Sequence, residues 1–355
     1  MAIQKQGLSM ISSTRTGLSL NAAGAVANTL VAELTRPTPP SVTRFAAAIV
    51  GTARPLGVLF YGSAARLLDN TAPERNAGAT AGAGSAENDA DLSDSVLDFY
   101  VIVERQRDWP RGRVARIANA LLPPNVEYHE RSIDGRVMRA KVAILSLAQF
   151  RRLTRPDAFD TTVWARFSQP ARLVWVRDAA AADAILRCVV RAVATAALWA
   201  AKLGPERGDA EQYWLGLFER TYAAELRVES SRRPASLLGG AEARYRRLLP
   251  LCWLAGDLPA SADGAMLDPG LPTAMRPPAS RRWRIRAGMG RPLNVARLIK
   301  ASFTFAGGAR YLVWKISRHT GVALTLTPFA ERHPLLAAPG VVIRLMRAGV
   351  FRRKA

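Results

Sequence analysis

A short apolar strand that ends in a Gly-Ser turn constrains the fold of this chain more than any other feature. Residues 58–61, Val-Leu-Phe-Tyr, predict a buried strand, and the residues after Gly62 and Ser63 predict a helix. Glycine has no Cβ, so the backbone of such a turn can approach a phosphate closely, and the N–H groups that open a helix favour anions. We therefore expect Tyr61, Gly62 and Ser63 to bind the phosphates of a nucleotide.

An acidic strand follows this turn. Residues 96–103 are a nearly continuous apolar run that contains Asp98, and Asp94 precedes it. Carboxylates beside a phosphate-binding turn can hold Mg²⁺, a hard cation that takes oxygen ligands. An aspartate at the start of a buried strand can also be a hydrogen-bonded cap. The Gly-, Ala- and Asn-rich residues 70–93 between the two strands predict either a mobile loop beside the site or a passive insertion.

The spacing of the two aspartates limits how they can share a metal ion. Four residues of a straight strand span about 13 Å at roughly 3.3 Å per residue, whereas Mg²⁺ ligands lie at about 2.0–2.1 Å. Either the chain bends before Val96, or Asp98 works with an acid from another element, such as Glu130. We therefore predict Asp98 as the main catalytic and metal-binding residue, with Asp94 as a second candidate ligand.

Two further strands predict a hairpin that carries a catalytic lysine. Residues 125–130 and 137–145 have strand patterns and are joined through Asp134-Gly135, a typical hairpin signal. Lys141 belongs to the second of these strands, which should lie beside Asp98, and we expect its ammonium group to contact a phosphate. The alternative is a surface lysine on an edge strand.

The second half of the chain predicts helices. The candidates, after a short helix at 23–33 and others at 41–52 and 114–122, cover residues 147–153, 161–167, 178–202, 211–229 and 241–254. We predict five regions: a flexible N-terminal segment (1–40), a nucleotidyltransferase domain (41–177), a helical domain (178–258), a Pro- and Gly-rich linker (259–280), and a basic membrane-associating C-terminal region (281–355).

The charge of the chain favours phosphate-rich partners. Among 355 residues, 50 are Lys or Arg and 28 are Asp or Glu, a net charge of +22. Residues 276–355 hold 17 basic residues and one acid, a net charge of +16. Near the C-terminus, four apolar residues between Val342 and Val350 share a helical face, which is typical of helices that bind anionic bilayers. An RNA-binding tail is the alternative. The predicted membrane-binding residues are Arg344, Arg347, Arg352 and Arg353.

Several classes of protein are excluded or disfavoured. Cys188 and Cys252 lack CxxC spacing and, with three scattered histidines, make no zinc-site pattern. Both lie among apolar residues, which predicts reduced core thiols and a cytosol-like compartment. We expect no spanning helix, since the nearest candidate, residues 179–201, carries a charged stripe on one face. The first 32 residues fit either a transit-like leader or a flexible terminus.

These motifs, in this order, resemble a known family. Tyr61-Gly62-Ser63, then residues 97–103 with Asp98, then Asp108-Trp109-Pro110 are similar to the mitochondrial-type CDP-diacylglycerol synthases of the translocator assembly and maintenance family. Residues 139–146 are similar to the strand that follows in that family, and the resemblance covers about residues 55–230. It implies an α+β fold: a polymerase β-like nucleotidyltransferase domain with a mixed sheet, then a helical domain and a basic amphipathic C-terminal region.

The resemblance also implies a reaction. CTP and phosphatidic acid would give CDP-diacylglycerol and pyrophosphate, with Mg²⁺ as cofactor, on an anionic membrane surface. It implies a peripheral protein on the cytoplasmic face of a bacterial inner membrane, or on the matrix side of a mitochondrial inner membrane. The superfamily usually has an Asp-x-Asp pair, but Val96 stands two residues before Asp98. The choice of CTP rests on the resemblance alone.

Two other functions stay open at this point. The same site could serve a nucleotidyltransferase that acts on RNA or on a small molecule. In the first case the basic tail would bind the RNA. The missing second aspartate would also fit a catalytically degenerate protein that binds nucleic acid, whose binding should depend steeply on salt.

Overall fold

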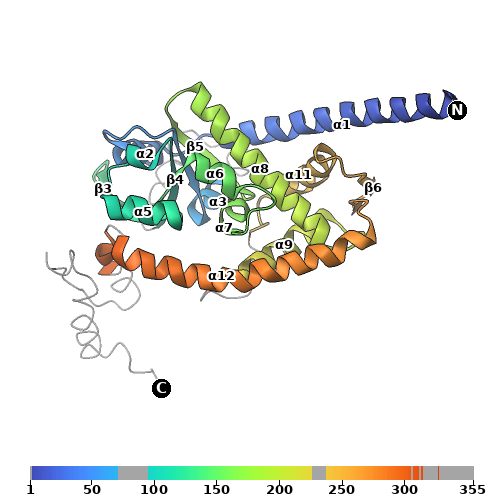
Figure 1. Cartoon of the computed structure of the whole chain (residues 1–355). Coiled ribbons are helices and arrows are strands. Elements are labelled where there is room, and N and C mark those ends of the chain that lie inside the picture. The colour runs from blue at the N-terminus through green and yellow to red at the C-terminus, as the bar shows by residue number, and fades with distance from the viewer. Residues whose placement is uncertain are drawn as a thin grey trace, which may run out of the picture.

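A mixed five-stranded sheet with the order β3-β4-β2-β1-β5 organises this α+β protein (Figure 1). Strand β2 pairs in parallel with β4, and the other neighbouring strands are antiparallel. The computed structural model describes residues 2–70, 95–225, 237–304, 307–311, 313, 314 and 327. The strands are β1 (Gly57–Tyr61), β2 (Val96–Val103), β3 (Asn125–Ile133), β4 (Arg136–Ser146) and β5 (Ala171–Val176).

Both faces of the sheet are covered, which explains why β1 and β2 are almost continuously apolar. On one face, α2 (Pro40–Val50) and α3 (Ser63–Asn70) pack on the sheet, and Phe45 and Phe60 contact the ring of Phe99. On the other face lie α6 (Leu147–Leu153), α7 (Thr162–Phe167) and α8 (Ala179–Leu203). The predicted strand at 96–103 and the predicted helices at 147–153 and 161–167 are confirmed. Strand β5 has no counterpart in the sequence-based prediction.

The predicted hairpin between β3 and β4 is also confirmed. Asp134 and Gly135 have φ values of 52° and 76°, the two positive values that a tight hairpin turn requires. Because β4 lies between β3 and β2, Lys141 is on an internal strand. The alternative interpretation, a lysine on an edge strand, is therefore wrong.

A bundle of helices lies beside the sheet. Helix α8 packs against α7, α9 (Ala210–Ala224) and α11 (Glu242–Ala255), and α1 (Ala2–Leu34) contacts α8 and α11. By length and composition α8 could cross a membrane, but 61% of its most apolar window is buried inside the protein. The remaining elements are η2 (Gln106–Asp108), α5 (Arg113–Leu121), β6 (Ser261–Asp263), β7 (Met266–Asp268) and η3 (Thr273–Met275).

Helix α1 occupies most of the segment that the sequence predicts to be flexible. Val26, Leu30 and Leu34 are buried against the helical bundle. Glu33, which is 4% exposed, pairs with the buried Arg244 of α11. A buried ion pair is costly to break, so it fixes the position at which the C-terminal end of α1 docks.

A long helix, α12 (Arg276–Thr304), crosses the underside of the protein from β6 to α5 (Figure 1). Its inward positions alternate at spacings of four and three, which is the period of one helical face. Trp283 is buried against Trp199 and Trp164, at ring-centroid distances of 5.5 and 6.4 Å. The inward positions are Ala279, Trp283, Arg286, Gly290, Leu293, Arg297, Lys300 and Thr304.

This helix spans the end of the predicted linker and the start of the predicted C-terminal region. Its Gly and Pro content makes the sequence look like irregular chain, but the packing of its inner face supports a helix. Several predictions fall outside the described residues: residues 71–93 of the predicted loop at 70–93, the metal ligand candidate Asp94, and the membrane-binding residues Arg344, Arg347, Arg352 and Arg353.

Both cysteines are buried and unpaired with one another, as the sequence predicts. Burial raises the pKa of the Cys188 thiol to about 11 and that of Cys252 to about 12. A thiol that stays protonated is a poor nucleophile and a poor metal ligand, so these residues contribute to packing.

Candidate active site

Three of the predicted site residues lie side by side across three neighbouring strands. Tyr61 of β1 pairs directly with Asp98 of β2, and Asp98 pairs directly with Lys141 of β4. Residues that pair directly across strands point to the same face of a sheet. The side chains of Tyr61, Asp98 and Lys141 therefore share the face toward the helical bundle.

Gly62 holds the Asp98 carboxylate close to the backbone of the turn. Its φ is 91°, and a Cβ built on it would lie 2.7 Å from Asp98 Oδ2. Only glycine combines this conformation with this approach. Helix α3 begins at the next residue, Ser63, so the turn, the first N–H groups of a helix and a carboxylate meet at one place.

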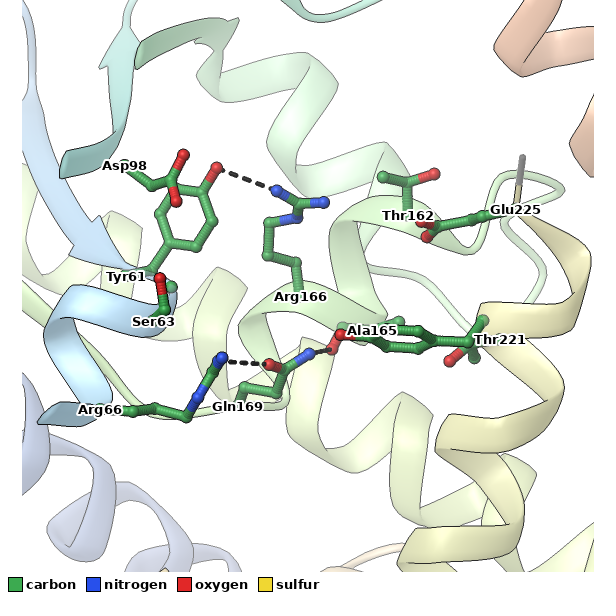
Figure 2. A pocket seen from close by; sticks show the side chains of 12 residues that line it. Tyr61, Ser63, Arg66, Asp98, Thr162, Ala165, Arg166, Gln169, Thr221 and Glu225 are labelled. Atoms are coloured by element: carbon green, nitrogen blue, oxygen red, sulfur yellow. Dashed lines mark hydrogen bonds between the residues drawn. The ribbon is translucent and has the colours of Figure 1, made fainter. Parts of the chain in front are cut away.

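A cavity opens beside this turn, which we name the polar cavity. Figure 2 shows its two sides: Tyr61 and Asp98 on one, Thr162 and Glu225 on the other, with Arg166 between them. At its base the Arg66 guanidinium donates a 3.2 Å hydrogen bond to Gln169 Oε1. The lining residues are Tyr61, Gly62, Ser63, Arg66, Asp98, Thr162, Ala165, Arg166, Gln169, Thr221, Tyr222 and Glu225.

Arg166 is a site residue that the sequence analysis missed. Its guanidinium donates a 2.9 Å hydrogen bond to the Tyr61 hydroxyl. Burial lowers the pKa of Arg166, but the neighbouring Tyr61, Tyr100, Glu225 and Asp98 raise it above its ordinary value, so Arg166 stays a cation. Burial raises the pKa of Tyr61, so its hydroxyl stays neutral. The available signal was weak: an arginine among the buried apolar residues of a short helix.

A second carboxylate in the cavity comes from the helical bundle. Glu225 follows α9 and lines the polar cavity together with Asp98. Helix α12 contacts α9 just before this residue, since a Cβ on Gly290 would lie 2.2 Å from the Ala224 carbonyl oxygen. The sequence offered Glu130 as the second acid instead. Glu130 pairs with Arg139 at 2.9 Å and does not line the polar cavity.

The polar cavity offers oxygen ligands that suit Mg²⁺. Asp98, Glu225, Ser63 and Thr162 offer oxygen atoms, the ligand type that Mg²⁺ prefers. Among the residues that the structure describes, no three His, Cys, Asp or Glu side chains gather as a metal site. A magnesium ion held by Asp98 would therefore take most of its ligands from nucleotide phosphates and water, as Mg²⁺ does in many nucleotide sites.

A second, larger cavity adjoins the first, and we name it the strap cavity. Its volume is about 370 Å³ against about 110 Å³ for the polar cavity, and it shares Tyr61, Asp98, Thr162, Arg166 and Glu225 with it. The sheet supplies apolar side chains and Lys141, and α12 supplies the opposite wall. Its other lining residues are Tyr100, Pro124, Val126, Lys141, Ala143, Asn294, Arg297, Leu298, Lys300, Ala301 and Thr304.

The strap cavity is rich in cations. Arg297 donates to the Pro123 carbonyl and pairs with Asp160, and Lys300 donates to the Leu122 carbonyl at 2.6 Å. Burial, with a smaller contribution from Arg297, lowers the pKa of Lys300 to about 8. With Lys141 and Arg166, these two side chains make four cations that line one cavity.

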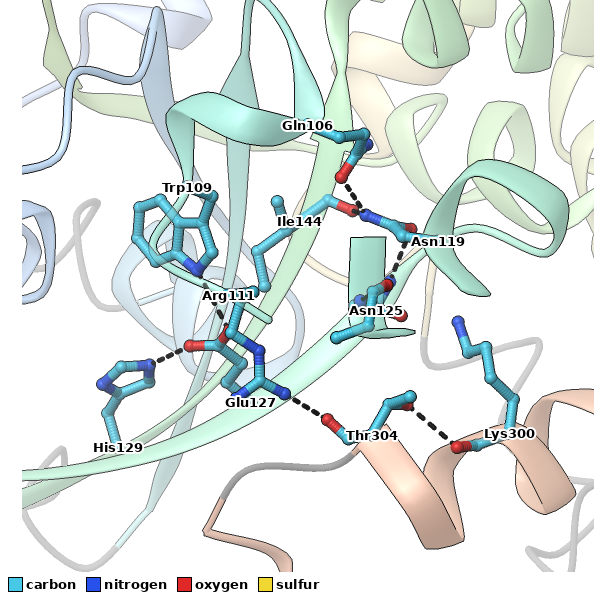
Figure 3. A network of polar contacts seen from close by, with 11 residues as sticks. Gln106, Trp109, Arg111, Asn119, Asn125, Glu127, His129, Ile144, Lys300 and Thr304 are labelled. Atoms are coloured by element: carbon cyan, nitrogen blue, oxygen red, sulfur yellow. Dashed lines mark hydrogen bonds and ion pairs between the residues drawn. The ribbon is translucent and has the colours of Figure 1, made fainter. Parts of the chain in front are cut away.

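The other face of the sheet carries a buried polar network that reaches the end of α12 (Figure 3). Glu127, which is 5% exposed, accepts hydrogen bonds from Trp109 Nε1 and His129 Nε2 at 3.0 Å each. It also pairs with Arg111, and Arg111 donates to the Thr304 carbonyl. Trp109, which contributes to the family resemblance, therefore packs on the face of the sheet opposite the two cavities.

No protein-family model matches the chain, and a search of curated proteins finds no match either. The family resemblance therefore depends on the residues of the turn, the acidic strand and the lysine strand themselves.

Proposed function

We propose that this protein is a Mg²⁺-dependent nucleotidyltransferase with a polymerase β-like domain, and that it transfers a cytidylyl group from CTP to phosphatidic acid. The observation that carries the proposal is the position of Asp98. It stands in register between Tyr61 and Lys141, and its carboxylate lies against Gly62 at the start of α3.

In this proposal the polar cavity binds the triphosphate of the nucleotide. The Gly62-Ser63 turn and the first N–H groups of α3 offer hydrogen-bond donors, and Arg66 adds a positive charge. Asp98 would hold the magnesium ion, which supplies charge neutralisation on the phosphates when it is bound. Lys141 remains the predicted catalytic cation beside it.

The strap cavity binds the acceptor phosphate. Its four cations outnumber its two carboxylates, Asp98 and Glu225, so the lining favours a phosphate monoester. The apolar side chains of Tyr100, Val126 and Ala143 suit the glycerol end of a lipid. A phosphate oxygen of phosphatidic acid attacks the α-phosphorus of CTP, and the bond from that phosphorus to the β-phosphate oxygen breaks. CDP-diacylglycerol forms and pyrophosphate leaves.

The proposed cytidylyl transfer requires positioning and charge neutralisation more than proton transfer. The acceptor phosphate is already an anionic nucleophile, so a general base is not required. Arg166 lies where the two cavities meet, and a cation at this junction can neutralise charge on both phosphates. CTP as the nucleotide is taken from the family resemblance.

The test is a transfer assay with four α-labelled nucleotides, Mg²⁺, phosphatidate vesicles and a separate RNA acceptor. We expect label from CTP in lipid, dependent on Mg²⁺. Asp98→Asn should reduce the rate about 10²-fold or more, since it removes the negative charge that would hold the magnesium ion. Asp183→Asn is the matched control, because Asp183 is an exposed acid on α8. Label in RNA, or an unchanged rate for Asp98→Asn, would contradict the proposal.

A further inference from the structure

The outer face of α12 exposes large apolar side chains to solvent. Ile285, Met289, Val295 and Ile299 are 54, 42, 45 and 60% exposed. At 3.6 residues per turn their directions fall within about one third of the helix circumference, opposite the inward positions that contain Trp283. A soluble protein rarely aligns exposed apolar residues in this way along a helix that is otherwise well packed.

The same helix is strongly basic. It contains eight Arg or Lys residues and no acid. Arg281, Arg284 and Arg291 are exposed and flank the apolar side chains. The neighbouring helix α5 repeats the pattern on a smaller scale, since Val114, Ile117 and Leu121 are 61–79% exposed and its only charges are arginines.

This face meets the strap cavity at one residue. Leu298 is 62% exposed, yet it also lines the strap cavity. The helix that closes the cavity on one side is therefore the helix that presents the apolar and basic side chains. Figure 1 shows α12 along the outer surface of the protein, with α5 beside its C-terminal half.

We infer that the outer face of α12, with α5 beside it, is a docking surface for an anionic lipid bilayer, and that a lipid reaches the strap cavity past Leu298. Exposed apolar side chains between arginines match the acyl boundary and the anionic headgroups of such a surface. A second copy of the chain fits poorly, because two faces without acids would repel each other. A nucleic acid partner would account for the arginines but not for the aligned apolar side chains.

The inference adds to the proposed function and rests on it only for the identity of the lipid that enters. The sequence predicted a membrane-associating region at 281–355, with binding residues near the C-terminus. The inference places membrane contact on the outer face of α12, which overlaps the start of that region. The strap cavity would then lie behind the bound helix, and a lipid could enter it from the bilayer past Leu298.

The test is flotation of the full-length protein with vesicles of phosphatidylcholine alone or with phosphatidylglycerol added. We expect binding only to the anionic vesicles. The triple variant Ile285→Asp, Met289→Asp, Ile299→Asp should bind at least about tenfold more weakly, because each exposed apolar side chain contributes to insertion. The matched control is Val137→Asp, an exposed apolar residue that is 49% exposed in the β3–β4 hairpin.

A second variant, in which Arg281, Arg284 and Arg291 are changed to glutamine, tests the charge without adding acids. Its binding to anionic vesicles should be weaker than that of the wild type at low salt. The difference should shrink as salt is raised, because salt screens the arginine charges of the wild type. Thermal unfolding checks that each variant is folded. Unchanged flotation of both folded variants, or a wild-type protein that binds RNA and not anionic vesicles, would overturn the inference.

Turnover of a water-soluble short-chain phosphatidate separates this inference from the proposed function. If α12-dependent flotation is found but no nucleotide is transferred to either lipid, the docking surface stands and the proposed function fails. If transfer to the short-chain lipid is found but flotation ignores the α12 variants, the docking surface fails and the proposed function stands.

Discussion

The carboxylate of Asp98 rests against the backbone of Gly62, where a Cβ would lie only 2.7 Å from Asp98 Oδ2. This contact joins the two halves of the candidate site, since Gly62 directly follows β1 and Asp98 lies on β2. Glycine is therefore required at position 62 both for the conformation of the turn and for the close approach of the Asp98 carboxylate.

Gly62→Ala should therefore disable the site. An added methyl group must displace the Asp98 carboxylate, and alanine is strained at a φ of 91°. We expect a loss of about 1–3 kcal/mol in the free energy of unfolding and loss of nucleotide transfer. Gly112→Ala is the control, because Gly112 has no atom within 4 Å of a built Cβ. Normal transfer by Gly62→Ala would contradict the close contact.

Tyr61→Phe should separate the role of the hydroxyl from that of the ring. The ring contacts Tyr100 at 5.2 Å and remains, but Arg166 loses the acceptor of its 2.9 Å hydrogen bond. We expect about 1–3 kcal/mol less stability and a lower transfer rate, because Arg166 is no longer held in place. Tyr213→Phe removes a hydroxyl that bonds to the Pro205 carbonyl, so it should lower stability without changing kcat.

The ammonium of Lys300 should make acceptor binding depend on pH. The pKa of Lys300 in the folded protein is about 8, below the ordinary value, so raising the pH from 7 to 9 removes a positive charge from the strap cavity. We expect KM for the phosphate acceptor to rise over this range. Lys300→Arg, which stays charged, should flatten that rise, and an unaltered profile would show that Lys300 does not contact the acceptor.

The lowered pKa of Lys300 also makes the free energy of unfolding depend on pH. Between the folded pKa of about 8 and the ordinary value near 10.4, the unfolded chain holds the Lys300 proton and the folded protein does not. Stability rises with pH where the unfolded state binds more protons. The wild type should therefore gain stability relative to Lys300→Met from about pH 8 to pH 10, as measured by urea unfolding at several pH values.

Trp283 should anchor α12 to the rest of the protein. It is 7% exposed and contacts two buried tryptophans, so Trp283→Ala should cost about 3–5 kcal/mol of unfolding free energy. Ile285→Ala, two residues away on the outer face, should change it by less than about 0.5 kcal/mol. Equal effects of the two changes would show that α12 does not dock through this face.

Local sequence patterns determined most of the sheet and the helices that cover it. The continuous apolar run at β2 and the Asp134-Gly135 turn carry their signals within a few residues, and so do the helices that begin after Ser146. The position of Lys141 beside Asp98 followed in the same way, since a hairpin strand had to join the acidic strand in one sheet.

Tertiary structure alone decided which side chains complete the site and what covers it. Arg166 belongs to α7 and Glu225 directly follows α9, helices whose own patterns only predict burial. Both residues line one cavity with Asp98 because the bundle folds back over the sheet. Helix α12 contains Gly288, Gly290 and Pro292, which locally disfavour a helix. Its helical form depends on contacts with distant residues, such as Trp199 and the Ala224 carbonyl, and such contacts exist only once the chain has folded.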